Sequence, residues 1–220
     1  MSRFLDMYAE MAQECMDERE DPPANLERCV ACNRCLVAED KPAETLYKCQ
    51  DCPISQATCR ACVLKEHRAR PFDRIRRWCR DEQFWDKIAL ADLGHVVHLG
   101  HGGERCPMVP VRQDGTIHHV LTRQMVILHE HGLAETAVSF CRCSPRQSDP
   151  EQLILAGLWP ASWNAPRTAT TMAALDAFHG LSVRAHVNIH DYVQHLKHMT
   201  DGVMTDDVKV SPRNEYQPDN

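Results

Sequence analysis

Six cysteines near the start of the chain form three pairs, each with two residues between its members: Cys29/Cys32, Cys49/Cys52 and Cys59/Cys62. A Cys-x-x-Cys turn holds two thiolates close enough to bind one metal ion, so one pair supplies half of a tetrahedral zinc shell and another pair completes it. The segment 29–73 is short and poor in apolar residues, so it can hardly bury a sufficient core. A structural zinc contributes about 10–16 kcal/mol of apparent binding energy, more than a typical domain's stability. We therefore expect metal binding and folding to be coupled.

The three pairs, together with one histidine and one aspartate that follow them, supply eight ligands, enough for two zinc ions. In interleaved two-zinc modules, the first and third pairs share one ion, and the second pair shares the other with the last two ligands. This arrangement predicts one site from Cys29, Cys32, Cys59 and Cys62, and another from Cys49, Cys52, His67 and Asp73. The spacing also permits Cys32/Cys35 as the first pair. We choose Cys29/Cys32 and leave Cys35 as a spare thiol.

A further cluster is predicted where a strand runs into Cys141 and Cys143. Alternate residues of a strand face the same way, so both thiols can reach one ion. Cys106 is the third candidate ligand, and the fourth comes from His101, His129 or His131, of which we choose His101. The competing interpretation is a pair of buried thiols at the end of a sheet, with Cys106 unconnected to them.

Composition limits the possible compartments and partners. The chain has 220 residues, twelve cysteines and a net charge of -6. Its first residues carry charges and no hydrophobic signal segment, so we expect a reducing, intracellular location and metal binding in place of disulfides. No apolar run reaches membrane length, and the acidic charge excludes nucleic-acid binding by bulk charge alone.

Arginines accumulate after the last cysteine pair, and those expected to contact nucleic acid, the arginine strip, are Arg68, Arg70, Arg74, Arg76 and Arg77. Arginines on a rigid platform bind phosphate oxygens in a bidentate manner. The alternative is an ordinary solvated face.

The elements that would position these ligands indicate an α+β fold. Apolar periodicity predicts an amphipathic helix within 1–20, followed by the two-zinc module at 26–80, which resembles B-box and ZZ fingers. A third domain at 81–200 combines a small β-rich segment that carries the Cys-x-Cys cluster with a helical C-terminal part, and a disordered tail is predicted at 201–220. Within the third domain we expect strands at 117–120, 125–128 and 134–140, and helices at 86–94, 149–157, 168–181 and 189–199.

The order of motifs along the chain resembles a known family. The motifs are Tyr47-Lys-Cys49-Gln-Asp-Cys52, Cys59-Arg-Ala-Cys62, Pro71-Phe72-Asp73-Arg74-Ile75, Leu99-Gly-His-Gly-Gly-Glu-Arg-Cys106-Pro, Phe140-Cys-Arg-Cys143 and Trp159-Pro160-Ala161. From about residue 29 to residue 201, the chain is similar to the CxC2-type cysteine-cluster domain of fungal Kyakuja-Dileera-Zisupton (KDZ) transposases. The family has histidine at the position of Asp73, and aspartate can also bind zinc.

The resemblance implies a zinc-binding protein that is not an enzyme, because the catalytic acids of such transposases lie in an RNase H-like domain beyond this region. The implied role is recognition of DNA or of a partner in the nucleus, with no membrane and no small-molecule substrate. The alternative is a protein-protein interaction module of the B-box or ZZ kind without DNA binding. A catalytic zinc at the Cys106 cluster is a third and weaker hypothesis, since no general base can be identified beside it.

Overall fold

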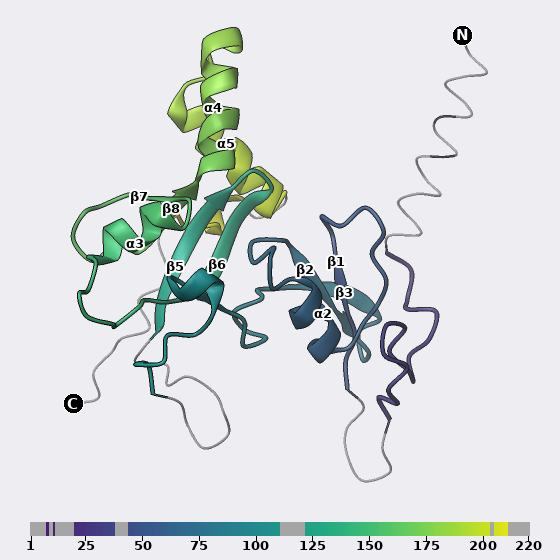
Figure 1. The fold of residues 1–220 in the computed structure, drawn as a ribbon. Helices are drawn as coiled ribbons and strands as arrows, with labels where there is room; N and C mark the ends of the chain where they lie inside the picture. Colours follow the sequence, from purple (N-terminus) through teal and green to yellow (C-terminus); the bar gives the residue numbers. More distant parts are fainter. Residues whose placement is uncertain are drawn as a thin grey trace, which may run out of the picture. The chain divides into compact units, whose positions relative to one another are not determined.

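The computed structural model describes residues 8, 11, 20–37, 44–110, 122–202 and 205–210. The chain divides into two compact units, which we describe separately: unit 1 is Met1–Glu66 with Ile75–Ile88, and unit 2 is His67–Arg74 with Ala89–Asn220. Both units contain helix and sheet, so the predicted α+β class is confirmed (Figure 1). The predicted helix within 1–20 lies almost entirely outside the described residues.

Unit 1 is built on a three-stranded antiparallel sheet in the order β1-β2-β3, together with a short helix. Its elements are β1 (Tyr47–Cys49), α2 (Arg60–Glu66), β2 (Ile75–Cys79) and β3 (Phe84–Ile88). Trp78 and Trp85 form a cross-strand pair with ring centroids 5.3 Å apart. Both rings pack with Leu36, Leu46 and two cysteine side chains in the core of this unit. The core is therefore small and includes sulfur atoms.

Unit 2 contains a five-stranded mixed sheet in the order β4-β6-β5-β8-β7. The strands β5 and β6 form an antiparallel hairpin, β4 and β8 add to it in parallel, and β7 pairs antiparallel with β8 at the edge. The bounds are β4 (Val96–His98), β5 (Thr122–His129), β6 (Gly132–Ser139), β7 (Leu158–Pro160) and β8 (Thr168–Thr171).

Helices pack on both faces of this sheet because alternate residues of β5 point to opposite sides. Met125 and Ile127 pack with α3 (Asp149–Leu155) through Leu153. Val126 and Leu128 pack on the other face with α5 (Ile189–Thr200), while α4 (Met172–Ala185) follows β8 directly. The helix α3 begins with a capping box between Ser148 and Glu151. The Cys-x-Cys loop thus lies between a buried strand and a capped helix.

Several predicted elements of unit 2 correspond to observed ones. The predicted helices at 149–157 and 189–199 correspond to α3 and α5, and two predicted strands lie in β5 and β6. The strand expected at 117–120 lies outside the described residues. Residues 168–171, predicted as helix, form β8, because Thr168, Ala169 and Thr170 pair with β5 and Thr171 pairs with β7 before the helix begins.

The unit boundaries differ from the predicted domain boundaries at 80 and 200. Residues 84–88 pair with β2 and so complete the sheet of unit 1, where the sequence had predicted the start of a helix at 86. Residues 67–74 belong to unit 2, where Phe72 packs against the core. Within the predicted tail, Val208 and Val210 also pack against unit 2, and Thr205–Asp207 form a turn of 3-10 helix, η3. These two valines give that part of the tail an apolar anchor.

Candidate metal centres

The first four-donor group lies in unit 1. One sulfur atom from each of Cys29, Cys32, Cys59 and Cys62 lies within 4.8 Å of the other three. The first two ligands flank a tight turn, closed by the hydrogen bond from Asn33 N to Cys29 O at 2.8 Å. The other two lie just before and within the first turn of α2. The group therefore joins a loop and a helix that are 30 residues apart in sequence, close to the interleaved arrangement predicted for the first site.

Backbone amides stabilise negative charge on this group. Burial alone would raise the pKa of Cys29, but hydrogen bonds from the backbone N–H groups of Cys59, Cys32 and Ala31 lower it to about 6. One of these bonds, from Cys59 N to Cys29 Sγ, measures 3.2 Å. Burial, and then the neighbouring thiols, raise the pKa of Cys62. The metal-free group thus combines a thiolate with protonated thiols, and a cation would displace the remaining protons.

Cys35, the alternative member of the first pair, lies outside the four-donor group. Its side chain is exposed, and its thiol donates to Val37 O at 3.1 Å. The structure thus brings together the set that includes Cys29, as chosen from the sequence, and leaves Cys35 as a separate thiol.

The second four-donor group lies in unit 2 and consists of His101, Cys106, Cys141 and Cys143. The imidazole Nε2 of His101 lies 3.2 Å from the sulfur of Cys141 and 3.5 Å from that of Cys143. The sulfur of Cys106 lies 3.7 Å from that of Cys143. Of the three histidines considered as the fourth ligand, the structure brings His101 to the three sulfurs.

A glycine turn brings that histidine to the sulfurs. His101 begins the 3-10 turn η1 (His101–Gly103), directly after Gly100, whose φ is 85°. A Cβ atom at Gly100 would lie 3.2 Å from the Cβ atom of Cys141 and in a backbone conformation that L side chains rarely adopt. Both constraints favour glycine here. The glycine-rich turn thus positions a candidate metal ligand.

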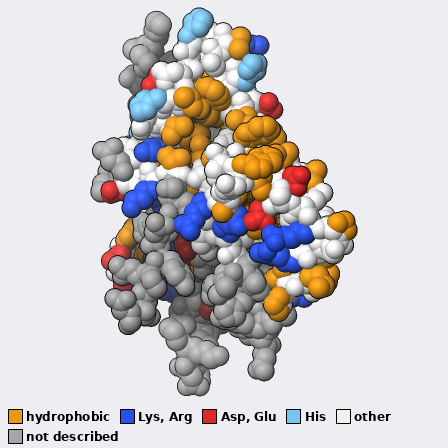
Figure 2. Space-filling model, turned by 90° about the vertical axis from the view of Figure 1, so that its left-hand side faces the viewer, with side chains coloured by type: hydrophobic (Ala, Val, Ile, Leu, Met, Phe, Trp, Pro, Cys, Tyr) orange, Lys and Arg blue, Asp and Glu red, His pale blue; other side chains and the backbone are white. Residues whose placement is uncertain are grey.

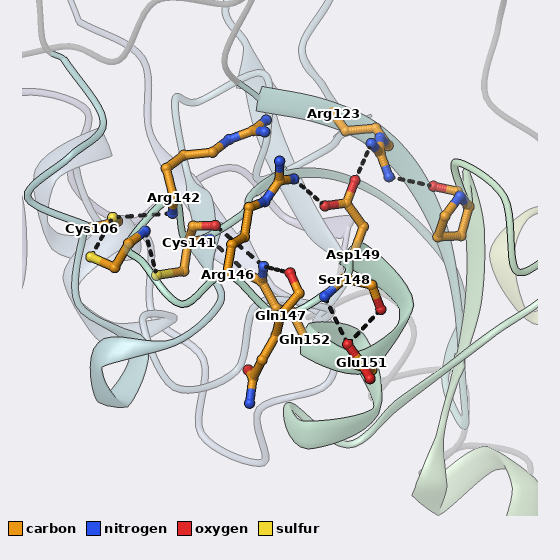
Figure 3. Close-up of polar contacts among 12 residues, drawn as sticks. Cys106, Arg123, Cys141, Arg142, Arg146, Gln147, Ser148, Asp149, Glu151 and Gln152 are labelled. Atoms are coloured by element: carbon orange, nitrogen blue, oxygen red, sulfur yellow. Dashed lines mark hydrogen bonds and ion pairs between the residues drawn. The ribbon is translucent and has the colours of Figure 1, made fainter.

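Backbone and side-chain donors hold the Cys-x-Cys loop around these sulfurs (Figure 3). Arg142 N lies 3.4 Å from the sulfur of Cys106, and Cys143 N lies 3.4 Å from that of Cys141. Burial opposes ionisation of Cys106, but the backbone N–H groups of Arg142 and Met108 are the main causes that lower its pKa to about 6. The neighbouring thiol of Cys106 is the largest cause that raises the pKa of Cys143, to about 11.

Gln152, on α3, was not recognised from the sequence. Its Oε1 accepts from Cys141 N at 2.7 Å, and its Nε2 donates to Cys141 O at 3.2 Å and to Gln147 O at 3.0 Å. The glutamine is buried. In the sequence, Gln152 is a polar residue directly before the apolar residues Leu153 to Leu155 of the predicted helix. That position could have drawn attention to it, but its hydrogen-bond partner is known only from the tertiary structure.

The residues predicted for the other zinc site of the N-terminal module are divided between the two units. In unit 1, the backbone amides of Asp51 and Cys52 each lie 3.3 Å from the sulfur of Cys49, whose pKa is raised by burial. In unit 2, His67 Nε2 lies 3.5 Å from Asp73 Oδ2, and both side chains are buried. Each half is therefore compatible with ligation, and their sharing of one ion stays a prediction.

The arginine strip is also divided. In unit 2, Arg68 pairs with Glu104, Arg70 Nε lies 3.7 Å from Asp73 Oδ2, and Arg74 donates to the last turn of α5 at 2.5 Å. These three arginines all contact acceptors of the protein.

In unit 1, the two remaining arginines of the strip are neighbours on β2 and so point to opposite faces. Arg76 pairs with Glu20, and Arg77 forms two bonds, of 2.8 and 3.1 Å, with Asp86. The strip is thus not one continuous surface of free charge within either unit.

The candidate histidines not chosen for the Cys106 group lie at the β5–β6 turn. His129, Glu130 and His131 have one potential ligand atom each within 4.8 Å of one another. His129 Nδ1 also lies 3.2 Å from Thr171 Oγ1. This arrangement of consecutive residues was not predicted as a metal site.

Comparison with known proteins gave one match. The model of a family described as "CxC2 like cysteine cluster associated with KDZ transposases" matches residues 90–204, just over half of the chain. The matched region contains all four donors of the group in unit 2 and begins after the cysteine pairs of unit 1, so it is shorter than the likeness expected from residue 29. Searches of curated proteins and of solved structures found no match. None of the described helices is long and apolar enough to cross a membrane.

Proposed function

Because the chain belongs to the family of CxC2-like cysteine clusters associated with KDZ transposases, we propose that it is a zinc-binding, non-catalytic recognition module. One observation carries the proposal. In each unit, four potential ligand atoms lie close enough together to bind one metal ion, from four cysteines in unit 1 and from three cysteines and one histidine in unit 2. Thiolate and imidazole donors in sets of four are typical of tetrahedral structural zinc. The four-donor group of unit 1 and the four-donor group of unit 2 would each hold one zinc ion.

A structural role for the metal is supported by the number of donors. Catalytic zinc sites use three protein ligands and keep one position for water or substrate, whereas His101 offers a fourth potential ligand in the cluster of unit 2. Four potential donors support a structural role over the third hypothesis from the sequence, catalysis at an open Cys₃ site. The interleaved B-box or ZZ-like module at 26–80 remains a finer proposal that depends on ligation by Cys49 and Cys52.

Metal content is the first test. Protein purified without added metal would be analysed for zinc, iron and protein concentration, and compared with Cys59→Ser and Cys143→Ser variants. Two zinc ions per chain or more are expected, with one ion lost in each variant. Metal-free protein that keeps its native circular dichroism would contradict the proposal.

We propose nucleic acid, encountered in the nucleus, as the target of recognition. The association of the family with transposases supports this target, and arginine is the side chain best suited to phosphate. Some contacts of the strip, such as Arg68–Glu104 and Arg77–Asp86, are surface ion pairs, which typically contribute less than about 1 kcal/mol and can exchange for phosphate.

Fluorescence anisotropy with a labelled DNA duplex at two salt concentrations tests this target. Binding that weakens as salt increases, and that weakens further in an Arg76→Ala/Arg77→Ala variant, is expected. Arg184→Ala, which removes an exposed arginine of α4, is the matched control for lost charge. Absence of binding to duplex and to single strands would exclude a nucleic-acid target.

A protein partner is the second candidate, favoured by the contacts of the strip itself. All five arginines have acceptors within the chain, and the net charge is -6. If a partner is captured that resists nuclease treatment and survives replacement of Arg76 and Arg77, this candidate is preferred over DNA.

A further inference from the structure

Basic and apolar side chains meet on one face of unit 2, and the residues considered below are not members of the arginine strip. Figure 2 shows Lys and Arg side chains gathered along one border of a run of hydrophobic side chains. Arg142 and Arg146 lie on the Cys-x-Cys loop and are exposed. Trp163 lies on the loop between β7 and β8, and 65% of its surface is accessible. We call Arg142, Arg146 and Trp163 the Arg–Trp face.

A carboxylate binds one of the arginines of this face. Asp149, at the start of α3, accepts from Arg146 at 2.6 Å and from Arg123 at 2.5 Å (Figure 3). One negative charge thus serves two guanidinium groups, which leaves one positive charge in excess. The neighbouring acid, Glu151, is engaged in the capping box with Ser148.

Arg142 adds a further positive charge, because Figure 3 shows no contact from its guanidinium to the residues drawn. Its side chain and that of Arg146 leave the loop on the side where Arg123 lies in that view. Three arginines, Arg123, Arg142 and Arg146, thus stand against two carboxylates, Asp149 and Glu151, so the local charge is positive by one, although the net charge of the chain is -6.

The same network fixes the loop that carries the tryptophan. Arg123 Nη1 donates to Pro166 O at 3.4 Å, three residues after Trp163. The other exposed tryptophan of this hairpin, Trp159, pairs with Thr170 on the sheet face that packs against α5. Trp163 is therefore the exposed tryptophan of the loop that Arg123 contacts through the carbonyl of Pro166.

We infer that the Arg–Trp face binds single-stranded nucleic acid, with Trp163 stacking on a base and Arg142 and Arg146 contacting the flanking phosphates. Exposed aromatic rings beside arginines suit single strands, because the faces of duplex bases are already stacked on one another. The inference rests on the nucleic-acid target proposed above but assigns it to another surface and to another form of the nucleic acid.

The four-donor group of unit 2, His101, Cys106, Cys141 and Cys143, would hold the Arg–Trp face in place when it binds a metal ion. Arg142 lies between two of its ligands, and Gln152 joins Cys141 to the helix that begins at Asp149. Loss of the ion from this group should therefore loosen the basic loop and weaken binding. The Arg–Trp face would thus be a metal-ordered surface.

Binding of labelled oligothymidylate and oligouridylate of about 15 nucleotides to the full zinc-loaded chain tests the inference, with a hairpin duplex for comparison. Trp163→Ala should weaken binding to the single strands about 5- to 150-fold, while Trp163→Phe should retain most of it. Arg142→Ala/Arg146→Ala should reduce the salt dependence, by about 1.4 in the slope of log K against log salt if both contacts are lost. The two probes differ in the sugar and in the C5 methyl group of the base, so unequal binding shows that at least one of these groups contributes.

Controls separate this inference from the proposed function. Zinc content should stay unchanged in every variant, and Arg184→Ala should bind normally. The melting temperature should fall only in Arg142→Ala/Arg146→Ala, which removes the ion pair between Arg146 and Asp149. If nucleic acid binds, but only the Arg76→Ala/Arg77→Ala variant is impaired, or if the duplex is preferred, the Arg–Trp face is excluded while the proposed function stands. If neither single strands nor duplex bind, both fail.

Discussion

Gln152 binds both backbone groups of Cys141: its Oε1 accepts from Cys141 N at 2.7 Å, and its Nε2 donates to Cys141 O at 3.2 Å. A metal ligand in a loop is thereby held from the side by a buried residue of α3. Hydrogen bonds of this kind orient ligands, and their loss typically lowers metal affinity about 10- to 100-fold.

Replacement of Gln152 tests this relationship. In Gln152→Ala the backbone N–H of Cys141 loses its partner, which should cost about 1–3 kcal/mol of folding free energy. Zinc bound at the Cys106 group should become easier to remove with a chromogenic chelator. Gln147→Ala is the matched control, because Gln147 contributes only its backbone carbonyl to this network. Equal rates of zinc removal in both variants would contradict the role of Gln152.

His101 provides a direct test of the fourth ligand. His101→Ala should lose one zinc ion per chain by elemental analysis, because three thiolates remain, whereas His101→Cys should retain it as a Cys₄ site. His129→Ala should keep the full metal content, since His129 lies outside this group. Full metal content in His101→Ala together with loss in His129→Ala would show that the wrong histidine was chosen.

Tryptophan fluorescence should report on the metal in unit 1. Trp78 and Trp85 are each 2% exposed and pack in the core that includes Cys29 and Cys59. Chelation should shift their emission to longer wavelength as this core opens, whereas Trp159 and Trp163 are exposed from the start. A Trp78→Phe/Trp85→Phe variant should lose the shift. Emission unchanged after complete metal removal would mean that this core does not depend on zinc.

Zinc affinity should decrease as the pH falls. Zinc displaces a proton from Cys143, whose pKa is raised to about 11, at any pH near neutrality. Below about pH 6, Cys106 also becomes protonated, because its pKa is lowered only to about 6. The plot of log affinity against pH should therefore be steeper below pH 6 than above it. Competition with a zinc indicator over about pH 5 to 8 measures both slopes, and a pH-independent affinity would contradict thiol ligation.

Asp149 should make the stability of unit 2 sensitive to acid. Burial acts to raise its pKa, but hydrogen bonds and charges from Arg123 and Arg146 outweigh burial and lower it below the ordinary value of 3.8. Its contribution is thus complete above the unfolded pKa and is lost as the pH falls through the folded pKa. Asp149→Asn should be less stable than the natural chain by about 1–3 kcal/mol at pH 7, with a smaller difference near pH 3. Urea unfolding at both pH values provides the comparison.

Much of the candidate metal chemistry could be predicted from the sequence, because the reach of a Cys-x-x-Cys turn or a Cys-x-Cys strand is set by local backbone geometry. Spacing indicated the cysteine pairs, but the grouping of Cys29, Cys32, Cys59 and Cys62 also used the ligand order of interleaved two-zinc modules, and Cys106 was one of several candidates for the other group. The helix at 149–157 followed from its capping pattern, which is equally local.

Tertiary structure decided what depends on contacts between distant segments. Spacing could not choose among three histidines, and only the turn at Gly100 brings His101 to the sulfurs. Pairing with β5 made residues 168–171 a strand, and ion pairs with acids elsewhere in the chain engaged arginines that the sequence presents as a free basic strip. The types of ligand and the local turns depend on residues that are close in sequence, so the sequence determines them. The partners of buried or charged side chains depend on how distant segments pack against one another, so only the tertiary structure decides them.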